Sequence, residues 1–393
     1  MSFLLGAVIA STVGYAVIGN AAASSIQSNS VTSITFSVIT PPNSNSNYSG
    51  TLGVLNGKVM VGDDASYFLT GNNGGPSTQK NVCRLAIVRP QPLHLMSNSS
   101  TDCDDPSLAG QPVVPIESVE KGGNTGDVRI SVRTSSGGFR VGPIVMRYGN
   151  YSDTRPEWTY GGGYLWIFDA EAPTNTEVLR ISESTGAVLS RVPMPWSSRV
   201  LLAADDDGLW IGQSVEGGWQ KGEVLPLLEF VGNHASAPIT ALQSPEPLNG
   251  GRVDWLVASG HTAIGAISQP NNTAVSAIDT FQSASKLPKT VKTGSTWEPS
   301  SIGEGPADAP PVIDVPGAGL LATKPGWDGQ FSETPTSESV LRINPQTGHN
   351  SQVAVLKSLS AADFIAYVYY KDALYLLAHS NGSGTATLFR VQV

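Results

Sequence analysis

Two nine-residue segments of this chain match each other closely, and they constrain its fold more than any other feature. One runs from Val178 to Gly186 (VLRISESTG) and the other from Val340 to Gly348 (VLRINPQTG). In both, an apolar, β-branched run predicts a strand, and the Thr-Gly ending predicts a tight turn in which glycine adopts a positive φ. The copies lie 162 positions apart, or three steps of roughly 54 residues, a period typical of repeat architectures.

The residues around the first copy predict a complete antiparallel sheet module. Tyr164–Phe168 is a short aromatic and β-branched run between glycines, Glu177–Ile181 follows as a second strand, and Ala187–Val192 returns as a third. The module then restarts, because Gly208-Leu209-Trp210-Ile211 repeats the order of residue types in Gly163–Ile167. Weaker restarts occur at Gly57–Val61, Asp254–Ala258, Gly319–Ala322 and Asp372–Leu377.

This combination of a Gly-x-Leu-Trp-Ile strand and a Val-Leu-Arg-Ile-x-x-x-Thr-Gly hairpin resembles the blades of secreted bacterial β-propellers, the loose group that includes streptogramin-lyase-like and NHL-type repeats. The resemblance implies an all-β, single closed propeller and covers about two thirds of the chain at fold level. Streptogramin lyases use a His and Glu constellation with a metal near the axis, and this chain offers no residue-by-residue match to it. The resemblance therefore implies a fold and assigns no catalytic residue.

The repeat spacing predicts seven four-stranded blades in one domain, residues 24–393, with six larger blades as the alternative. Strands near the two ends, residues 31–39 and 387–393, are expected to share a blade and so close the ring, which removes an exposed sheet edge. Residues 128–148 predict a hairpin. By contrast, residues 104–127 and 283–311 are poor in strand signal and rich in proline, which predicts connections or an irregular blade.

Composition and the N-terminal segment both favour export. Only 14% of the residues are charged, against roughly 25% in average soluble proteins. Residues 3–19 form an uncharged apolar run followed by Ala21–Ala23, the order of a signal peptide and its cleavage site. No Lys or Arg precedes Lys58, so the alternatives for residues 1–23 are a signal peptide, a retained membrane anchor or a buried strand. The formal charge of −9 without a basic stripe excludes a typical nucleic-acid partner.

The two cysteines, Cys83 and Cys103, are expected to form a disulfide if the protein is exported. The bond would close a loop, a constraint worth roughly 3 kcal/mol in the chain-entropy model. Two unrelated buried thiols are the alternative. A metal site at these cysteines is disfavoured, because no histidine or third cysteine has the required spacing.

Tryptophans in turn-like sequence are the candidate ligand-binding residues. Trp166, Trp210 and Trp255 lie in strand runs and are predicted to be core. The candidates lie instead among turn residues and near two carboxylates: Trp219, Trp297, Trp327, Glu298 and Asp328. They predict either an aromatic platform for a sugar or peptide, or long loops packed onto the body.

Asp205, Asp206 and Asp207 are the candidate metal ligands, because three carboxylates before a strand could hold a divalent cation. A solvated turn is the alternative, since neighbouring residues of an extended chain point to opposite sides. The five histidines are isolated in sequence, and His261, flanked by glycine, is the most accessible candidate. The chain contains no nucleophile elbow, phosphate-binding loop or dinucleotide fingerprint.

These observations predict an exported, non-enzymatic, monomeric β-propeller that binds a protein, peptide or glycan at the cell envelope or outside the cell. The catalytic residues remain unassigned, and no cofactor is predicted, although the sequence leaves a divalent cation open as an alternative. One alternative is a lyase or hydrolase with an axial metal-assisted site. The other is a structural cell-envelope component anchored by residues 3–19.

Overall fold

The computed structural model describes residues 31–37, 47–55, 57–69, 78–98, 112–119, 125–134, 139–149, 157–169, 176–195, 200–213, 226–243, 252–259, 262–268, 275–283, 289–297, 312–315, 319–326, 337–357, 362–380 and 385–393. All of the regular structure in these residues is β-strand. Within them, no helix is long and apolar enough to cross a membrane. The predicted signal peptide or anchor, residues 1–23, lies outside them.

The described strands form six four-stranded antiparallel sheets and one three-stranded sheet. The sheet that joins the two ends of the described chain, called the terminal sheet, contains β1 (Val31–Ser37), β25 (Ala362–Tyr370), β26 (Ala373–Ser380) and β27 (Thr385–Gln392). The first sheet contains β2 (Asn47–Leu55), β3 (Lys58–Leu69), β4 (Thr78–Pro90) and β5 (Leu93–Asn98). The second, with three strands, contains β6 (Val113–Val119), β7 (Thr125–Arg133) and β8 (Phe139–Gly149).

The other four sheets follow in chain order. The third contains β9 (Glu157–Gly161), β10 (Tyr164–Asp169), β11 (Glu177–Ser182) and β12 (Val188–Pro193). The fourth contains β13 (Val200–Ala204), β14 (Gly208–Gln213), β15 (Pro226–Gly232) and β16 (Ile239–Gln243). The fifth contains β17 (Arg252–Ser259), β18 (Thr262–Ser268), β19 (Val275–Gln282) and β20 (Lys289–Trp297). The sixth contains β21 (Val312–Val315), β22 (Gly319–Gly326), β23 (Ser337–Ile343) and β24 (Asn350–Lys357).

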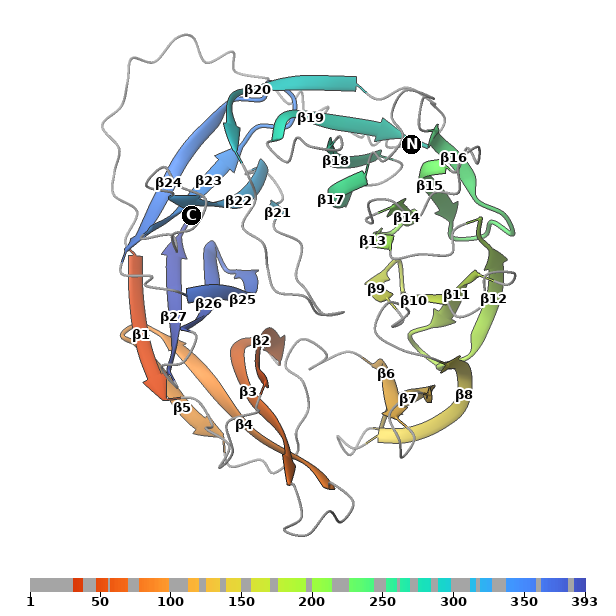
Figure 1. Cartoon of the computed structure of the whole chain (residues 1–393), viewed down its shortest axis with the longest axis horizontal. Helices are drawn as coiled ribbons and strands as arrows, with labels where there is room; N and C mark the ends of the chain where they lie inside the picture. The colour runs from red at the N-terminus through yellow and green to blue at the C-terminus, as the bar shows by residue number, and fades with distance from the viewer. Residues whose placement is uncertain are drawn as a thin grey trace, which may run out of the picture.

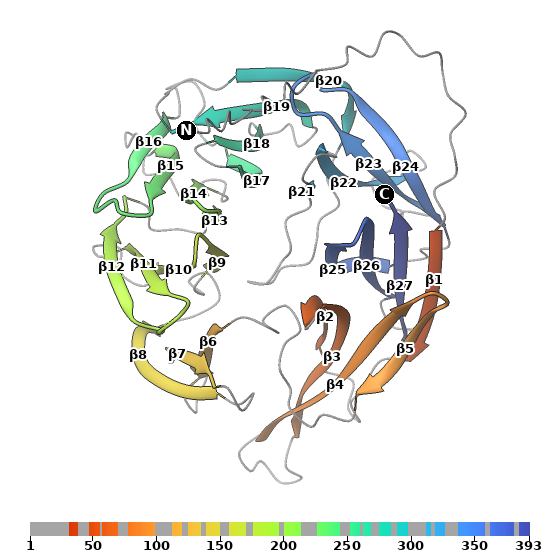
Figure 2. The same cartoon turned by 180° about the vertical axis from the view of Figure 1, so that it is seen from behind.

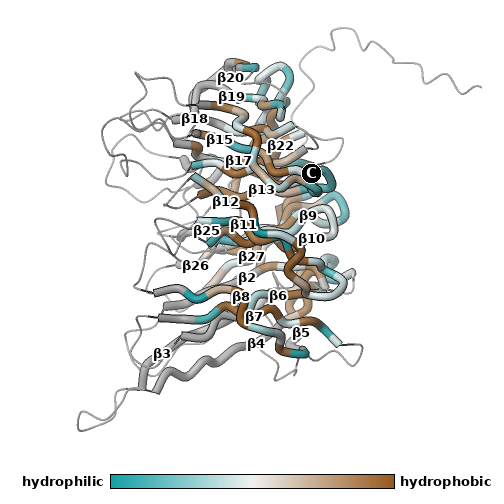
Figure 3. Tube along the Cα trace, turned by 90° about the vertical axis from the view of Figure 1, so that its right-hand side faces the viewer, coloured by the Kyte–Doolittle hydropathy of each residue, from teal (hydrophilic) through white to brown (hydrophobic). Residues whose placement is uncertain are grey.

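The sheets follow one another around a central axis (Figures 1 and 2). In several of them the strand that comes first in the chain lies nearest the axis, as β9, β13 and β17 do, and the last strand lies at the periphery, as β12, β16 and β20 do (Figure 1). In the terminal sheet β25 lies nearest the axis and β1 lies at the periphery (Figure 1). Hydrophobic residues run through the strands, and hydrophilic residues occupy many of the turns (Figure 3). Radial, antiparallel sheets of this kind define a β-propeller.

The strands near the two ends of the chain pair with each other, as the sequence predicted. β1 lies antiparallel to β27, in a register that runs from Val31 opposite Val391 to Ser37 opposite Thr385. β27 also pairs with β26 on its other side. The terminal sheet is therefore built from both ends of the described chain.

The core consists of hydrophobic clusters between neighbouring sheets. Six clusters of described side chains join the terminal sheet to the first, and then the second to the third, the third to the fourth, the fourth to the fifth, the fifth to the sixth and the sixth to the terminal sheet. Trp166, Trp210 and Trp255 are each 0% exposed within these clusters, which confirms that they are core residues. None of the six clusters of described side chains joins the first sheet to the second.

The two matching sequence segments form matching hairpins. In the β11–β12 hairpin the amide of Gly186 donates to the carbonyl of Ser182 at 2.8 Å, and in the β23–β24 hairpin the amide of Gly348 donates to the carbonyl of Asn344, also at 2.8 Å. The φ angles of the two glycines are 71° and 70°, a left-handed conformation that side chains disfavour. The repeat therefore reflects a shared turn geometry.

The structure corrects three details of the sequence prediction. The segment 104–127 contains a strand, β6, and the segment 283–311 contains another, β20. The sequence treated Asp254–Ala258 and Gly208–Ile211 as the same position of the repeat, but they are not equivalent. Asp254–Ala258 belongs to β17, the first strand of its sheet, and Gly208–Ile211 belongs to β14, the second strand of its sheet. The predicted three-stranded module around Gly186 gains an inner strand, β9.

Candidate functional site

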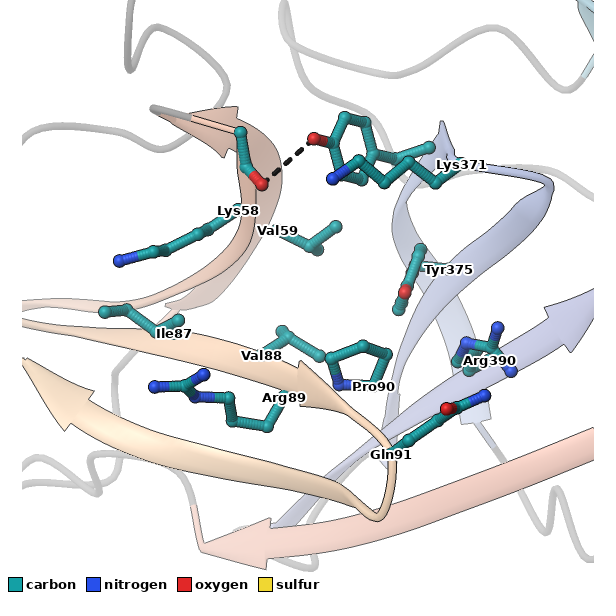
Figure 4. Close-up of a pocket in the computed structure, with 12 residues that line it drawn as sticks. Lys58, Val59, Ile87, Val88, Arg89, Pro90, Gln91, Lys371, Tyr375 and Arg390 are labelled. Atoms are coloured by element: carbon teal, nitrogen blue, oxygen red, sulfur yellow. Dashed lines mark hydrogen bonds between the residues drawn. The ribbon is translucent and has the colours of Figure 1, made fainter.

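A pocket of about 370 Å³ lies between the terminal sheet and the first sheet (Figure 4). Three hairpin turns form most of its rim: the β2–β3 turn at Gly57, the β4–β5 turn at Gln91 and the β25–β26 turn at Lys371. Its lining residues are Gly57, Lys58, Val59, Ile87, Val88, Arg89, Pro90, Gln91, Tyr370, Lys371, Tyr375 and Arg390.

The pocket has an apolar floor that belongs to the hydrophobic core. Val59, Val88 and Tyr375 are each 4% exposed, and all three are members of the cluster between the two sheets. The alternation of strand side chains explains the position of Val59, because Val59 and Val61 of β3 point to this interface together. The floor is therefore fixed by packing that the fold itself requires.

The charged residues of the lining are all cationic. Lys58, Arg89, Lys371 and Arg390 contribute four positive charges, and the described lining residues include no carboxylate. The whole chain has a formal charge of −9, so this concentration of positive charge runs against the overall composition. Within the described part of the chain, none of these four side chains forms an ion pair.

Arg390 is the most buried of the four cations, with 9% of its surface exposed. Its Nη2 donates a hydrogen bond of 2.6 Å to Oε1 of Gln392, whose Nε2 in turn donates to the carbonyl of Asp372 at 2.7 Å. The Nε of Arg390 is buried and has no hydrogen-bond partner among the residues that the structure describes. A buried donor without an acceptor is unfavourable by roughly 1–3 kcal/mol, and by more when it is charged.

The turn that presents Lys371 to the pocket has an unusual backbone. Lys371 and Asp372 have φ angles of 48° and 58°, as the central residues of a two-residue type I′ hairpin require. Asn and Gly are the residues preferred there, and a lysine with positive φ is uncommon. The Nζ atom of Lys371 lies 5.0 Å from the ring centroid of Tyr370, and the hydroxyl of Tyr370 donates to the carbonyl of Gly57 at 2.9 Å.

The chemistry of the lining suits binding. Among the described lining residues, the polar side-chain groups are the four cations, the amide of Gln91 and two tyrosine hydroxyls, with no carboxylate, imidazole, thiol or aliphatic hydroxyl. A cavity of a few hundred Å³ with an apolar floor and a few convergent polar groups is typical of a ligand site.

The tryptophan candidates cannot be placed as a group. Trp219, Glu298, Trp327 and Asp328 lie outside the described residues, and Trp297 is the last residue of β20, opposite Val275. The aromatic platform therefore stays a prediction.

The cysteine and histidine candidates are also largely outside the described residues. Cys83 lies in β4 opposite Asp64, whereas Cys103 and His261 lie outside. The disulfide therefore stays a prediction.

The three consecutive aspartates form the turn between β13 and β14. Oδ1 of Asp205 accepts a hydrogen bond of 2.9 Å from the amide of Asp207, and the carbonyl of Asp206 accepts one from the side-chain amide of Asn233. Among the residues that the structure describes, no group of three or more His, Cys, Asp or Glu side chains is arranged to hold a metal ion.

Sequence reasoning missed the pocket entirely. Its cations come from positions 58, 89, 371 and 390, which are brought together only when the terminal and first sheets pack against each other. The one local signal of the pocket was the Lys371-Asp372 pair. These residues form a two-residue hairpin turn, where Asn and Gly are the preferred residues.

Comparison with known proteins yields structural similarity only. No protein-family model matches the chain, and no curated protein matches it. Among solved structures, the WD40 domain of Pan2 from Neurospora crassa is similar with a TM-score of 0.42 and 11% sequence identity, covering 93% of this chain and 97% of that one. Sqt1 from Saccharomyces cerevisiae is similar with a TM-score of 0.42 and 12% identity, covering 93% of this chain and 100% of that one.

Proposed function

We propose that this protein is a non-enzymatic β-propeller of seven blades in a closed ring, and that it binds a protein or peptide partner through the pocket between the terminal and first sheets. The observation that carries the proposal is the composition of this pocket. It combines an apolar floor with two tyrosines and two arginines, residue types enriched among the dominant contacts of protein interfaces.

Two features support binding over catalysis. General acid–base or nucleophilic catalysis needs a titratable or nucleophilic group beside a partner that activates it. Tyrosine, lysine, arginine and glutamine supply all the polar side chains of the lining, and none forms such a pair. The rim also consists of hairpin turns from three strand pairs, which a partner can contact without entering the ring.

The proposal includes export and a monomeric state. Export is supported by the apolar run at residues 3–19, which small residues follow, and by the low content of charged residues, 14%. In the exported protein, residues 1–23 are a cleaved signal peptide, and Cys83 and Cys103 form a disulfide. Two further hypotheses also rest on the sequence. One is membership of the streptogramin-lyase-like or NHL-type propellers, and the other is glycan binding at the tryptophans.

Selection of random peptides displayed on phage tests the proposed binding. The purified protein is compared with Ile87→Trp, in which a larger side chain fills the pocket from a half-buried lining position. The matched control is Val141→Trp on β8, where the side chain is 59% exposed and far from the pocket in the fold. We expect peptides that bind the wild-type protein and Val141→Trp but not Ile87→Trp. A selection that enriches no peptide, or peptides that bind all three proteins equally, would overturn the proposed function.

A further inference from the structure

We propose that the pocket between the terminal and first sheets recognises an anionic group on its peptide partner, either a phosphate or a carboxylate. This inference rests on the proposed function, because it names the chemistry of the ligand at the same site. It is carried by the charge of the lining, by the unpaired buried nitrogen of Arg390 and by the backbone of the Lys371 turn.

The charge of the pocket is uncompensated. Lys58, Arg89, Lys371 and Arg390 line one cavity of about 370 Å³, and no carboxylate occurs among the lining residues that the structure describes. The nearest acidic residue in sequence is Asp372, whose Oδ1 accepts a hydrogen bond of 3.3 Å from the hydroxyl of Tyr369. Because like charges repel, four cations around one cavity favour a ligand that brings negative charge.

Arg390 supplies the buried contact of the site. Figure 4 places it at one end of the pocket, beside Tyr375 and Gln91, whereas Lys58 and Arg89 extend toward the other end. The Nη2 of its guanidinium donates to Gln392, and its buried Nε has no partner within the described ranges of the chain. An anionic oxygen is the acceptor that such a donor favours, because charge-assisted hydrogen bonds to arginine are the stronger kind and can be bidentate.

Lys371 supplies a cation held in an unfavourable conformation. A lysine at φ 48° would be replaced by asparagine or glycine if stability alone determined the residue. Backbone strain of this kind clusters at ligand-binding sites, where a particular side chain is needed at the strained position. The observed strain therefore fits a role for the ammonium group in binding.

The size of the pocket limits the ligand to a side chain or a short segment. A volume of about 370 Å³ lies at the small end of the range for ligand sites, roughly 300–1,000 Å³. An acidic or phosphorylated side chain can reach Arg390 while the flanking residues of the peptide contact Lys58, Arg89 and the apolar floor.

Binding of three defined hexapeptides, measured by fluorescence anisotropy at fixed ionic strength, tests the inference. The peptides alternate glycine with glutamate, with phosphoserine or with glutamine, and inorganic phosphate serves as the competitor. We expect the glutamate or the phosphoserine peptide to bind at least roughly tenfold more tightly than the glutamine peptide, as a charge-assisted contact to arginine predicts. The tighter of the two identifies the source of the anion.

Two variants and one control assign binding to the pocket. Arg390→Gln removes the buried cation, and circular dichroism shows whether this variant still folds. The double variant Lys58→Gln with Lys371→Asn removes two exposed cations, so it tests the site even if Arg390→Gln misfolds. The control, Arg140→Gln, removes an exposed cation from β8. We expect a roughly tenfold loss for each pocket variant and no change for the control.

The outcomes separate this inference from the proposed function. Equal binding of all three hexapeptides, or equal losses in the pocket variants and Arg140→Gln, would overturn the anionic site. If phage selection also yields neutral, pocket-dependent peptides, the proposed function stands while the anionic site falls. Conversely, direct binding of inorganic phosphate, measured by calorimetry and lost in Arg390→Gln, without binding of any peptide would support an anion site and overturn the peptide partner.

Discussion

The hydroxyl of Tyr370 donates a hydrogen bond of 2.9 Å to the carbonyl of Gly57, a residue 313 positions away in the chain. This bond joins the β25–β26 turn to the β2–β3 turn, and hence the terminal sheet to the first sheet across the rim of the pocket. A comparable bond joins the second and third sheets, where the hydroxyl of Tyr160 donates to the carbonyl of Val113 at 2.9 Å.

These two bonds give a matched pair of variants. Tyr370→Phe and Tyr160→Phe each keep the ring and lose the hydroxyl, so each is expected to lower the free energy of unfolding by about 1 kcal/mol. Only Tyr370→Phe should also weaken binding of the acidic hexapeptide, because Tyr370 lines the pocket. Urea denaturation and anisotropy measure the two effects. Equal binding by the two variants would show that this bond does not organise the site.

The strained turn predicts a variant that gains stability and loses function. Lys371→Asn places at φ 48° a residue that tolerates the left-handed conformation, so the free energy of unfolding should rise by roughly 0.5 kcal/mol. The same variant removes a cation from the pocket and should weaken binding of the acidic hexapeptide. Denaturation and binding are measured on the same sample. A variant that is less stable than the wild-type protein would mean that Lys371 contributes to folding through contacts other than its charge.

Pairing of β1 with β27 predicts the effect of shortening the chain. Deletion of residues 387–393 removes most of β27, including the buried Leu388, Phe389 and Val391, and leaves β1 and β26 with unpaired edges. Exposed edges pair with other chains, so the truncated protein should aggregate, which size-exclusion chromatography would detect. Deletion of Val393 alone, beyond the end of β27, is the control. A monomeric 387–393 deletion with an unchanged melting temperature would contradict the importance of this pairing.

The sequence predicted those parts of the fold that depend on local chemistry. The Thr-Gly turns at Gly186 and Gly348 were recognisable because only a few residue types adopt a positive φ, and their hydrogen bonds prove to be the same. Trp166 and Trp210 were recognisable as core because each lies within an apolar strand run.

The strands that sequence analysis missed depend on tertiary pairing. β6 contains Pro115, which lacks a backbone donor, yet among the described strands β6 is an edge strand that pairs only with β7. The free side of an edge strand makes no ladder hydrogen bonds, so a proline there costs none. β20 is likewise an edge strand, paired only with β19, so its weak pattern is compensated by a neighbour that the sequence does not identify.

The candidate site was beyond the reach of local patterns. Sequence reasoning selected tryptophans and aspartates by residue type, whereas the pocket is defined by the position of ordinary cations in three turns and one strand. Arg390 lies within a strand next to Phe389 and Val391, where nothing local distinguishes a charge that lines a cavity from one that faces solvent. Only the packing of two sheets from opposite ends of the chain makes that distinction.

A buried acid lies between the third and fourth sheets. Glu229 of β15 is 3% exposed. Its Oε1 accepts a hydrogen bond of 3.3 Å from Thr240, and its Oε2 is buried and has no partner in the described part of the chain. Burial raises the pKa of this carboxyl from 4.5 to about 7, although the Thr240 hydrogen bond lowers it in part. The folded protein therefore holds this proton more tightly than the unfolded chain does.

The sign of the pH dependence follows from this difference. Below pH 4.5 the carboxyl is protonated in both states and its contribution is at its most favourable; as the pH rises through 4.5 and then 7, the folded state must bury a charge or retain the proton, and stability falls. The loss at pH 8 should be about 3 kcal/mol. Glu229→Gln cannot ionise, so it should be more stable than the wild-type protein at pH 8 and should show a smaller decline between pH 5 and pH 8. Asp206→Asn, at an exposed turn position, is the control, and urea denaturation at several pH values is the measurement. A decline of the same size in Glu229→Gln and in the wild-type protein would show that Glu229 does not hold the proton.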